Sequence, residues 1–172
     1  QMKQNFMNKK VIYIILILII LLGSFLRIYG LGNESFWVDE SATAYSTQQS
    51  TSYIINNIYT KATLIPTYFK EGAGEMPLYY LMTYYWTNLF GLSELKLRFL
   101  SALFGIISIY LIFLIGKIMF NHKIGLVAAF IIAINHQHIY YSQEARNYAF
   151  LIFLTLLSVY FLIRALKKNK NL

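Results

Sequence analysis

The chain of 172 residues contains no cysteine, little charge and only seven acidic residues. The absence of cysteine excludes disulfides and thiolate metal sites, and it leaves the redox compartment undetermined. Charged residues make up 13% of the chain, whereas hydrophobic residues make up 58%. A soluble domain of this length could not bury so much apolar surface, so the composition predicts a membrane protein.

Several functional patterns are also missing. The sequence contains no convincing repeat, zinc-ligand spacing, phosphate-binding loop or nucleotide-binding fingerprint. The formal net charge is +8. In a membrane protein, an excess of lysine and arginine usually reports cytoplasmic loops and anionic lipid, so we expect no nucleic-acid partner.

Long apolar runs predict transmembrane helices, which need roughly 17–25 such residues. The first run covers about residues 11–29. It is too long for a signal peptide and no small-residue cleavage site follows it, so we interpret it as an uncleaved anchor. Arg27 lies near its far end, where a long basic side chain can extend toward the interface. Three further spans are predicted over about residues 99–119, 124–142 and 147–165.

A fifth uncharged run, over residues 77–93, decides the topology. If it crossed the membrane, the last helix would end outside together with the basic cluster at 164–170, against the positive-inside rule. With four spans, that cluster lies in the cytoplasm and all seven acidic residues lie outside. We therefore predict an all-α, polytopic protein of the plasma membrane, with both termini in the cytoplasm and an outer loop over residues 30–98.

Two helices of this outer loop are expected to lie along the membrane surface, over about residues 40–59 and 77–92. Asp39 can cap the first of them. The second begins with Pro77, which suits a first helical turn, and it is rich in tyrosine and tryptophan, which favour the membrane interface.

The predicted topology brings four polar groups to the same outer face. They are Asp39–Glu40, Glu75, Arg98 and the stretch 142–148. The planar fork of arginine suits phosphate, and a carboxylate can act as general base on a hydroxyl. These groups can therefore build a pocket for an anionic lipid head and an activated hydroxyl. Each also has a structural alternative, as a helix cap, a solvated loop acid or an interfacial anchor.

Metal binding is not predicted. His136 and His138 are spaced i, i+2, which puts them on different faces of a helix, so interfacial hydrogen bonding is favoured over joint ligation. The gathered carboxylates leave a divalent cation as an open alternative, although no ligand spacing requires one.

Four stretches occur in order and carry a resemblance. They read LRIYGLGNESFWVDESATAY, GEMPLYYLMTYYW, LKLRFLSALFG and HIYYSQEARNYAF. Together they resemble the N-terminal part of the GT-C class of membrane glycosyltransferases, such as the protein O-mannosyltransferases and the aminoarabinose transferase that modifies lipid A. The resemblance covers about residues 24–150 and only part of a typical family member. We therefore interpret the chain as a fragment of a longer enzyme.

The resemblance implies transfer of a hexose or pentose from a polyprenyl-phosphate donor to a hydroxyl of a protein, lipid or glycan at the non-cytoplasmic membrane face. It implies that Asp39 is the catalytic base, with Glu40 as its acidic neighbour. It also implies that Arg98 faces the donor phosphate or the catalytic carboxylate. Four residues are placed near the same pocket: Gln143, Glu144, Arg146 and Tyr148.

One stretch departs from the family pattern. Glu75-Met76-Pro77 stands where the family often has His-Pro-Pro or Glu-Lys-Pro-Pro. Glu75 matches the second version, but no lysine follows it, so donor contacts are expected to shift to Arg98 and Arg146. The sugar and the acceptor are left open.

These residues predict an inverting transfer, in which Asp39 accepts the proton of the attacking hydroxyl and Arg98 and Arg146 meet the charge of the leaving phosphate. A non-catalytic membrane assembly or lipid-handling subunit is the alternative, because it could use the same basic and aromatic surface. A transporter is disfavoured, because the centres of the spans are almost wholly apolar.

Overall fold

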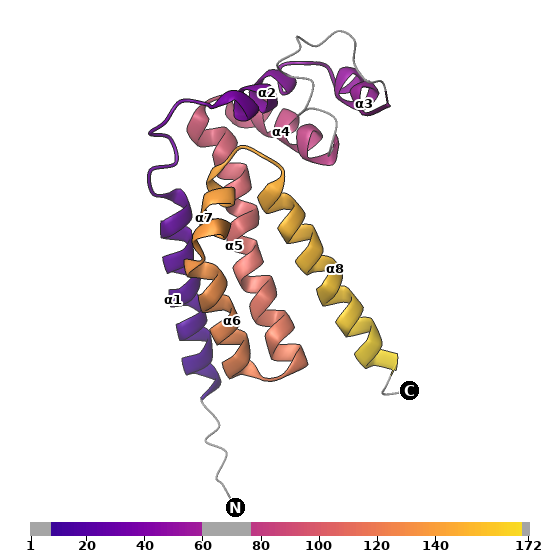
Figure 1. The fold of residues 1–172 in the computed structure, drawn as a ribbon. Coiled ribbons are helices and arrows are strands. Elements are labelled where there is room, and N and C mark those ends of the chain that lie inside the picture. Colours follow the sequence, from indigo (N-terminus) through magenta and orange to yellow (C-terminus); the bar gives the residue numbers. More distant parts are fainter. Residues whose placement is uncertain (1–7, 60–76, 170–172) are drawn as a thin grey trace, which may run out of the picture.

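The computed structural model describes residues 8–59 and 77–169, and all regular structure in these two ranges is helical. The helices are α1 Lys9–Ile28, α2 Val38–Ser46, α3 Thr51–Tyr59, α4 Pro77–Phe90, α5 Glu94–Met119, α6 His122–Ile134, α7 His136–Gln143 and α8 Tyr148–Asn169. They form a bundle of long helices with a layer of short ones across one end (Figure 1).

Three helices, α1, α5 and α8, are each long and apolar enough to cross a bilayer. Together, α6 and α7 make a fourth candidate span, which is bent by 58° at its break. The polytopic all-α prediction is thus confirmed. The third predicted span, over 124–142, is a bent pair rather than one continuous helix.

The bundle is organised around α5, which packs against α1 and α6 on one side and α8 on the other (Figure 1). Buried Ile109 and Phe113 of α5 pack with Leu16 of α1 and Ala129 of α6. Helices α5 and α6 pack closely at two glycines. A Cβ atom added at Gly116 would lie 2.8 Å from the Cα atom of Gly125. The two backbones therefore approach more closely than a side chain would allow.

The short helices α2, α3 and α4 lie across one end of the bundle (Figure 1). With 14 residues, α4 is only ~21 Å long, too short to cross a bilayer. The surface helix expected over 40–59 is divided into α2 and α3. The hydroxyls of Ser46 and Thr47 donate to the carbonyls of Ala42 and Ala44, competing with the backbone at the end of α2.

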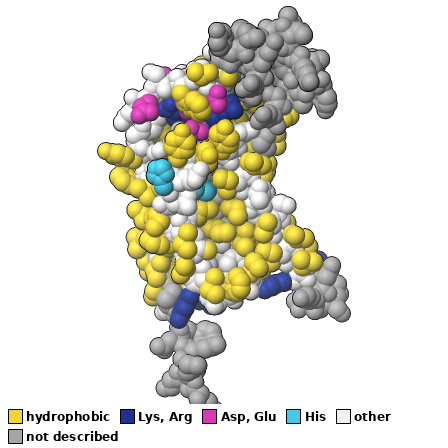
Figure 2. All heavy atoms as spheres, in the orientation of Figure 1, with side chains coloured by type: hydrophobic (Ala, Val, Ile, Leu, Met, Phe, Trp, Pro, Cys, Tyr) yellow, Lys and Arg dark blue, Asp and Glu magenta, His cyan; other side chains and the backbone are white. Residues whose placement is uncertain are grey.

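The two ends of the bundle differ in charge. The start of α1 and the end of α8 lie together at the end opposite α2 (Figure 1). The lysines on that side are Lys9, Lys10, Lys117, Lys123, Lys167 and Lys168. Acidic side chains gather at the α2 end, above a hydrophobic belt (Figure 2). Among the described residues, charge and element order thus distinguish a basic end from an end that carries the acids.

Candidate active site

The first turn of α2 carries two adjacent carboxylates in different environments. Trp37, rather than Asp39, is the N-cap residue of α2, so Asp39 and Glu40 both lie inside the helix. The side chain of Glu40 is 1% exposed, whereas that of Asp39 is 42% exposed. Two acids that are neighbours in sequence therefore face the protein interior and the solvent, respectively.

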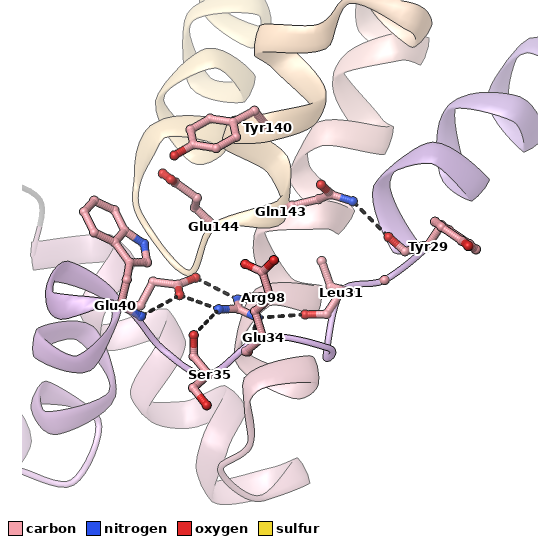
Figure 3. Close-up of a pocket in the computed structure, with 11 residues that line it drawn as sticks. Tyr29, Leu31, Glu34, Ser35, Glu40, Arg98, Tyr140, Gln143 and Glu144 are labelled. Atoms are coloured by element: carbon pink, nitrogen blue, oxygen red, sulfur yellow. Dashed lines mark hydrogen bonds and ion pairs between the residues drawn. The ribbon is translucent and has the colours of Figure 1, made fainter.

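Glu40 forms a buried, bidentate ion pair with Arg98 near the start of α5. Arg98 donates from Nε to Oε1 at 2.8 Å and from Nη2 to Oε2 at 2.6 Å (Figure 3). Paired N–H donors facing two carboxylate oxygens are the strongest geometry available to such a pair.

The remaining donors of Arg98 hold the segment between α1 and α2. Its Nη1 donates to the carbonyls of Leu31 and Glu34, at 3.0 and 2.8 Å, and its Nη2 donates to that of Ser35 at 3.2 Å. All five N–H groups of the guanidinium thus have acceptors. Arg98 has the contacts of a residue that fixes a loop.

Glu40 is equally well bonded. Its Oε1 also accepts the backbone N–H of Ala145 at 2.8 Å, and its Oε2 accepts that of Trp37 at 3.4 Å. The carboxylate therefore joins α5, the start of α2 and the loop after α7. A proton acceptor needs an accessible lone pair, and those of Glu40 are already used inside the protein.

Asp39 faces a second arginine with looser geometry. Arg146 Nη2 lies 3.9 Å from Asp39 Oδ2, and Arg146 Nη1 donates to the Asp39 carbonyl at 3.3 Å. The Arg146 side chain is 7% exposed, and its Nε has no hydrogen-bond partner among the described residues. Within the described part of the chain, the Arg146 guanidinium is thus a buried cation with one unsatisfied donor, and it lies beside an exposed carboxylate.

The position of Arg146 is set by α4 and α5. Ser101 Oγ donates to the carbonyl of Arg146 at 3.2 Å, and the hydroxyls of Ser101 and Tyr79 hydrogen bond at 2.8 Å. The guanidinium carbon of Arg146 lies 5.9 Å from the centroid of the Tyr148 ring. Tyr148 is therefore an aromatic neighbour of Arg146, and the predicted surface helix α4 supplies a buried support through Tyr79.

A pocket of about 420 Å³ opens on the other side of Glu40 (Figure 3). Its walls include the side chains of Glu34, Trp37, Arg98, Tyr140 and Glu144. Burial raises the pKa of the Glu144 carboxyl, and a hydrogen bond with Tyr140 opposes that rise. Arg98 is the only cation among the described residues of this wall, and it is already paired with Glu40. A phosphate here would therefore meet carboxylates without a compensating charge from the described residues.

Gln143, at the end of α7, lines this pocket and also makes a structural contact. Its amide nitrogen donates to the carbonyl of Tyr29 at 3.1 Å (Figure 3) and to that of Leu26 at 3.2 Å. These carbonyls lie at the end of α1, where helices leave acceptors without intrahelical partners. Gln143 thus ties α7 to α1.

Glu75 lies outside the described residues, so its predicted contact with the donor stays a prediction. Within the described ranges, no group of three or more histidine, cysteine, aspartate or glutamate side chains could hold a metal ion. His138 instead contacts Arg27, through Nδ1 and Arg27 Nη2 at 2.9 Å.

The sequence did not indicate several of these contacts. Ser101 and Tyr79 look like ordinary helix residues, although Ser101 follows Arg98 at i+3, which places both on one face of α5. Arg27 is wholly buried, so the expectation that it extends toward the interface is wrong. Its spacing i, i+4 from Gly23 was the available signal that it points into the bundle.

The fold and the site define a class: an integral membrane protein whose helical bundle carries buried and exposed arginine–carboxylate pairs at one end. A protein-family comparison is more specific. Residues 74–172 match the family model described as dolichyl-phosphate-mannose-protein mannosyltransferase. The match covers more than half of the chain. The chain therefore belongs to this family of GT-C glycosyltransferases. Searches of curated proteins and of solved structures found no match.

Proposed function

We propose that the chain is the catalytic-face portion of a glycosyltransferase that moves a sugar from a polyprenyl-phosphate donor to an acceptor hydroxyl. The observation that supports this most is the arrangement of Asp39 and Arg146. An exposed carboxylate lies 3.9 Å from a buried guanidinium that has an unused donor. This arrangement, in a member of a glycosyltransferase family, supports assigning Asp39 as the proton acceptor and Arg146 as the anion-binding group.

The reaction proceeds as an inverting displacement. The acceptor oxygen forms a bond to the anomeric carbon while the bond from that carbon to the phosphate oxygen breaks. The polyprenyl phosphate leaves with the bonding electron pair, and Arg146 stabilises the charge that develops on it. Asp39 takes the proton of the attacking hydroxyl. No nucleotide is needed, because the lipid phosphate is the leaving group.

Arg146, rather than Arg98, is assigned to the leaving phosphate. Arg98 has acceptors for all its donors, so a phosphate would have to displace Glu40 or the carbonyls of the α1–α2 segment. Among the described residues, Arg146 has no bidentate carboxylate partner to displace, because its contact with Asp39 is 3.9 Å long. We therefore assign Glu40 and Arg98 to holding the site, Asp39 and Arg146 to the chemistry, and Tyr148 to orienting Arg146.

Charge supports the proposed orientation. Of the seven described lysines, all but Lys96 lie at the end where α1 begins and α8 ends, and the positive-inside rule puts that end in the cytoplasm. The α2 end, with Asp39 and Arg146, then faces the opposite side of the plasma membrane. Both termini are cytoplasmic in this arrangement.

The test is Asp39→Asn in the full-length protein, reconstituted with polyprenyl-phosphate mannose and a mixture of candidate acceptors. The amide keeps the shape of the side chain but cannot accept the proton, so transfer should be lost while folding is retained. Glu94→Gln is a matched control, because it removes an acidic charge at the same end of the bundle. Near-normal turnover by Asp39→Asn would exclude Asp39 as the base.

A photo-reactive polyprenyl-phosphate sugar tests the assembly-subunit alternative. A donor bound for catalysis should label the residues around Asp39 and Arg146, and Arg146→Gln should abolish the labelling. Labelling spread over the hydrophobic belt and insensitive to Arg146 would instead favour a lipid-handling subunit.

A further inference from the structure

The break between α6 and α7, the third span in chain order, is stabilised by specific contacts. Asn135 ends α6 with φ −65° and ψ 116°, and its side chain caps α7 by accepting the backbone N–H of His138 at 2.8 Å. Such a break leaves the last carbonyls of α6 without intrahelical donors. Inside a bilayer, those carbonyls need partners from elsewhere in the protein.

Arg27 of α1 supplies these partners. Its Nη1 donates to the carbonyl of Ala133 at 3.0 Å, and its Nη2 donates to that of Ile132 at 2.9 Å. The same guanidinium reaches Nδ1 of His138 at 2.9 Å, on the far side of the break. One buried cation therefore caps the C-terminal end of α6, where the helix dipole favours positive charge, and contacts α7 as well.

A glycine on α5 leaves room for this guanidinium. A Cβ atom at Gly105 would lie 3.1 Å from Arg27 Nε and 2.8 Å from the Cβ atom of Ser142. Ser142 is on α7 and hydrogen bonds within that helix to the His138 carbonyl at 2.6 Å. Helices α1, α5, α6 and α7 thus meet at this buried contact.

The direction of α7 determines where the site residues lie. Gln143 ends α7 against the end of α1. Two residues later the Ala145 N–H donates to Glu40, and Arg146 follows beside Asp39. A change in the bend would therefore move Arg146 relative to Asp39. Helix α7 links the contact at Arg27 to the site.

We infer that Arg27 is a positioning residue, which sets the α6–α7 bend and thereby holds Arg146 beside Asp39. The bend does not depend on the chemistry assigned above, whereas the effect on transfer rests on the proposed function. Arg27 contacts no substrate in this account. It acts through α7.

These 172 residues contain no cysteine, so a direct distance test is possible in the full-length protein once any cysteine elsewhere in it is replaced by serine. Spin labels at Ile124 on α6 and Tyr140 on α7, both exposed, report the bend. Straightening the pair completely would lengthen their separation by ~3 Å, from a helical rise of about 1.5 Å per residue. Labels at Ile124 and Tyr110 on α5 form a reference pair that does not cross the break.

Arg27→Gln should lengthen and broaden the Ile124–Tyr140 distance and leave the reference distance unchanged. Arg27→Lys keeps the charge but not the fork, so it should shift the distance less. Arg164→Gln on α8 is the matched control, because it removes an arginine charge from an exposed helix end and should change neither distance. In unlabelled protein, transfer per folded molecule should fall at least 10-fold for Arg27→Gln and be partly restored in Arg27→Lys.

If Arg27→Gln does not fold, Gly105→Ala tests the same contact by crowding Arg27 and Ser142 without removing a charge. An unchanged Ile124–Tyr140 distance in the folded variants would overturn the inference, whatever the activity. A changed distance with normal transfer would overturn the link to the site alone. Loss of the proposed function through Asp39→Asn would leave the distance result standing, so the two failures are distinguishable.

Discussion

The Arg98–Glu40 and Arg146–Asp39 pairs use neighbouring carboxylates of one helical turn, yet they are built differently. The first has a separation of 2.6 Å and two nearly inaccessible side chains. The second has a separation of 3.9 Å and an exposed carboxylate, and its guanidinium retains an unpartnered Nε within the described residues. In the first pair the polar groups are satisfied by the protein, whereas in the second the carboxylate is exposed and one buried guanidinium donor is unsatisfied by the described residues.

The comparison separates two roles that identical residue types can have. Removing one partner of a buried ion pair leaves an uncompensated charge, whereas an exposed pair contributes little to stability. We therefore expect variants of the first pair to unfold the protein and variants of the second to impair transfer.

Arg98→Ala and Glu40→Ala should each lower the free energy of unfolding by about 3–5 kcal/mol, because each leaves a buried charge without its partner. Denaturant unfolding in detergent, followed by helical circular dichroism, measures this change. Asp39→Ala should cost no more than about 1 kcal/mol in the same assay. Equal losses for Glu40→Ala and Asp39→Ala would remove the distinction between the pairs.

Arg146→Gln should lower the transfer rate by about 10²–10³-fold, the usual effect of losing a group that stabilises transition-state charge. Arg146→Lys should not restore the rate, because a single ammonium cannot replace the planar fork. The measurement is single-turnover transfer from a radiolabelled polyprenyl-phosphate sugar. A normal rate in Arg146→Gln would assign the phosphate to another cation.

Gln143→Ala should lower the free energy of unfolding by about 1 kcal/mol, because it removes the donor shared by two carbonyls at the end of α1. This variant tests whether Gln143 belongs with the structural pair rather than with the donor site. Thermal unfolding gives the cost, and donor titration gives the affinity. If Gln143→Ala weakened the affinity for the sugar donor without lowering stability, Gln143 would be a donor-binding residue instead.

The smallest effect concerns pH. Because burial raises the pKa of Glu144 above its ordinary value of 4.5, the folded state holds this proton more tightly than the unfolded chain. Glu144 therefore makes stability fall as pH rises from about the ordinary value through the raised one. Glu144→Gln should flatten unfolding curves measured across that range. An unchanged pH slope would show that Glu144 contributes nothing to it.

The sequence predicted the helical spans and the arginine and carboxylate types of the site, because apolar length and charge asymmetry act locally along the chain. Apart from the family resemblance, nothing in the sequence distinguished the environments of Asp39 and Glu40. Both lie in the first turn of α2, and only the tertiary position of Arg98 buries one of them. Adjacent positions on a helix point about 100° apart, so which one faces the core depends on packing.

The bend at Asn135 and the buried Arg27 show a second limit. A continuous apolar run predicts a span, but the run does not reveal that α6 ends within it. The carbonyls exposed by that break are satisfied by a side chain more than a hundred residues away in sequence. Without coordinates, an arginine near a span end is indistinguishable from an interfacial anchor.

The most direct measurement compares Asp39→Asn with Glu40→Gln, each assayed for both single-turnover transfer and unfolding in the full-length protein. The account predicts that Asp39→Asn unfolds like the wild type and has lost transfer, whereas Glu40→Gln is markedly less stable. If Glu40→Gln were as stable as the wild type but inactive, and Asp39→Asn were active, the two carboxylates would have the opposite roles.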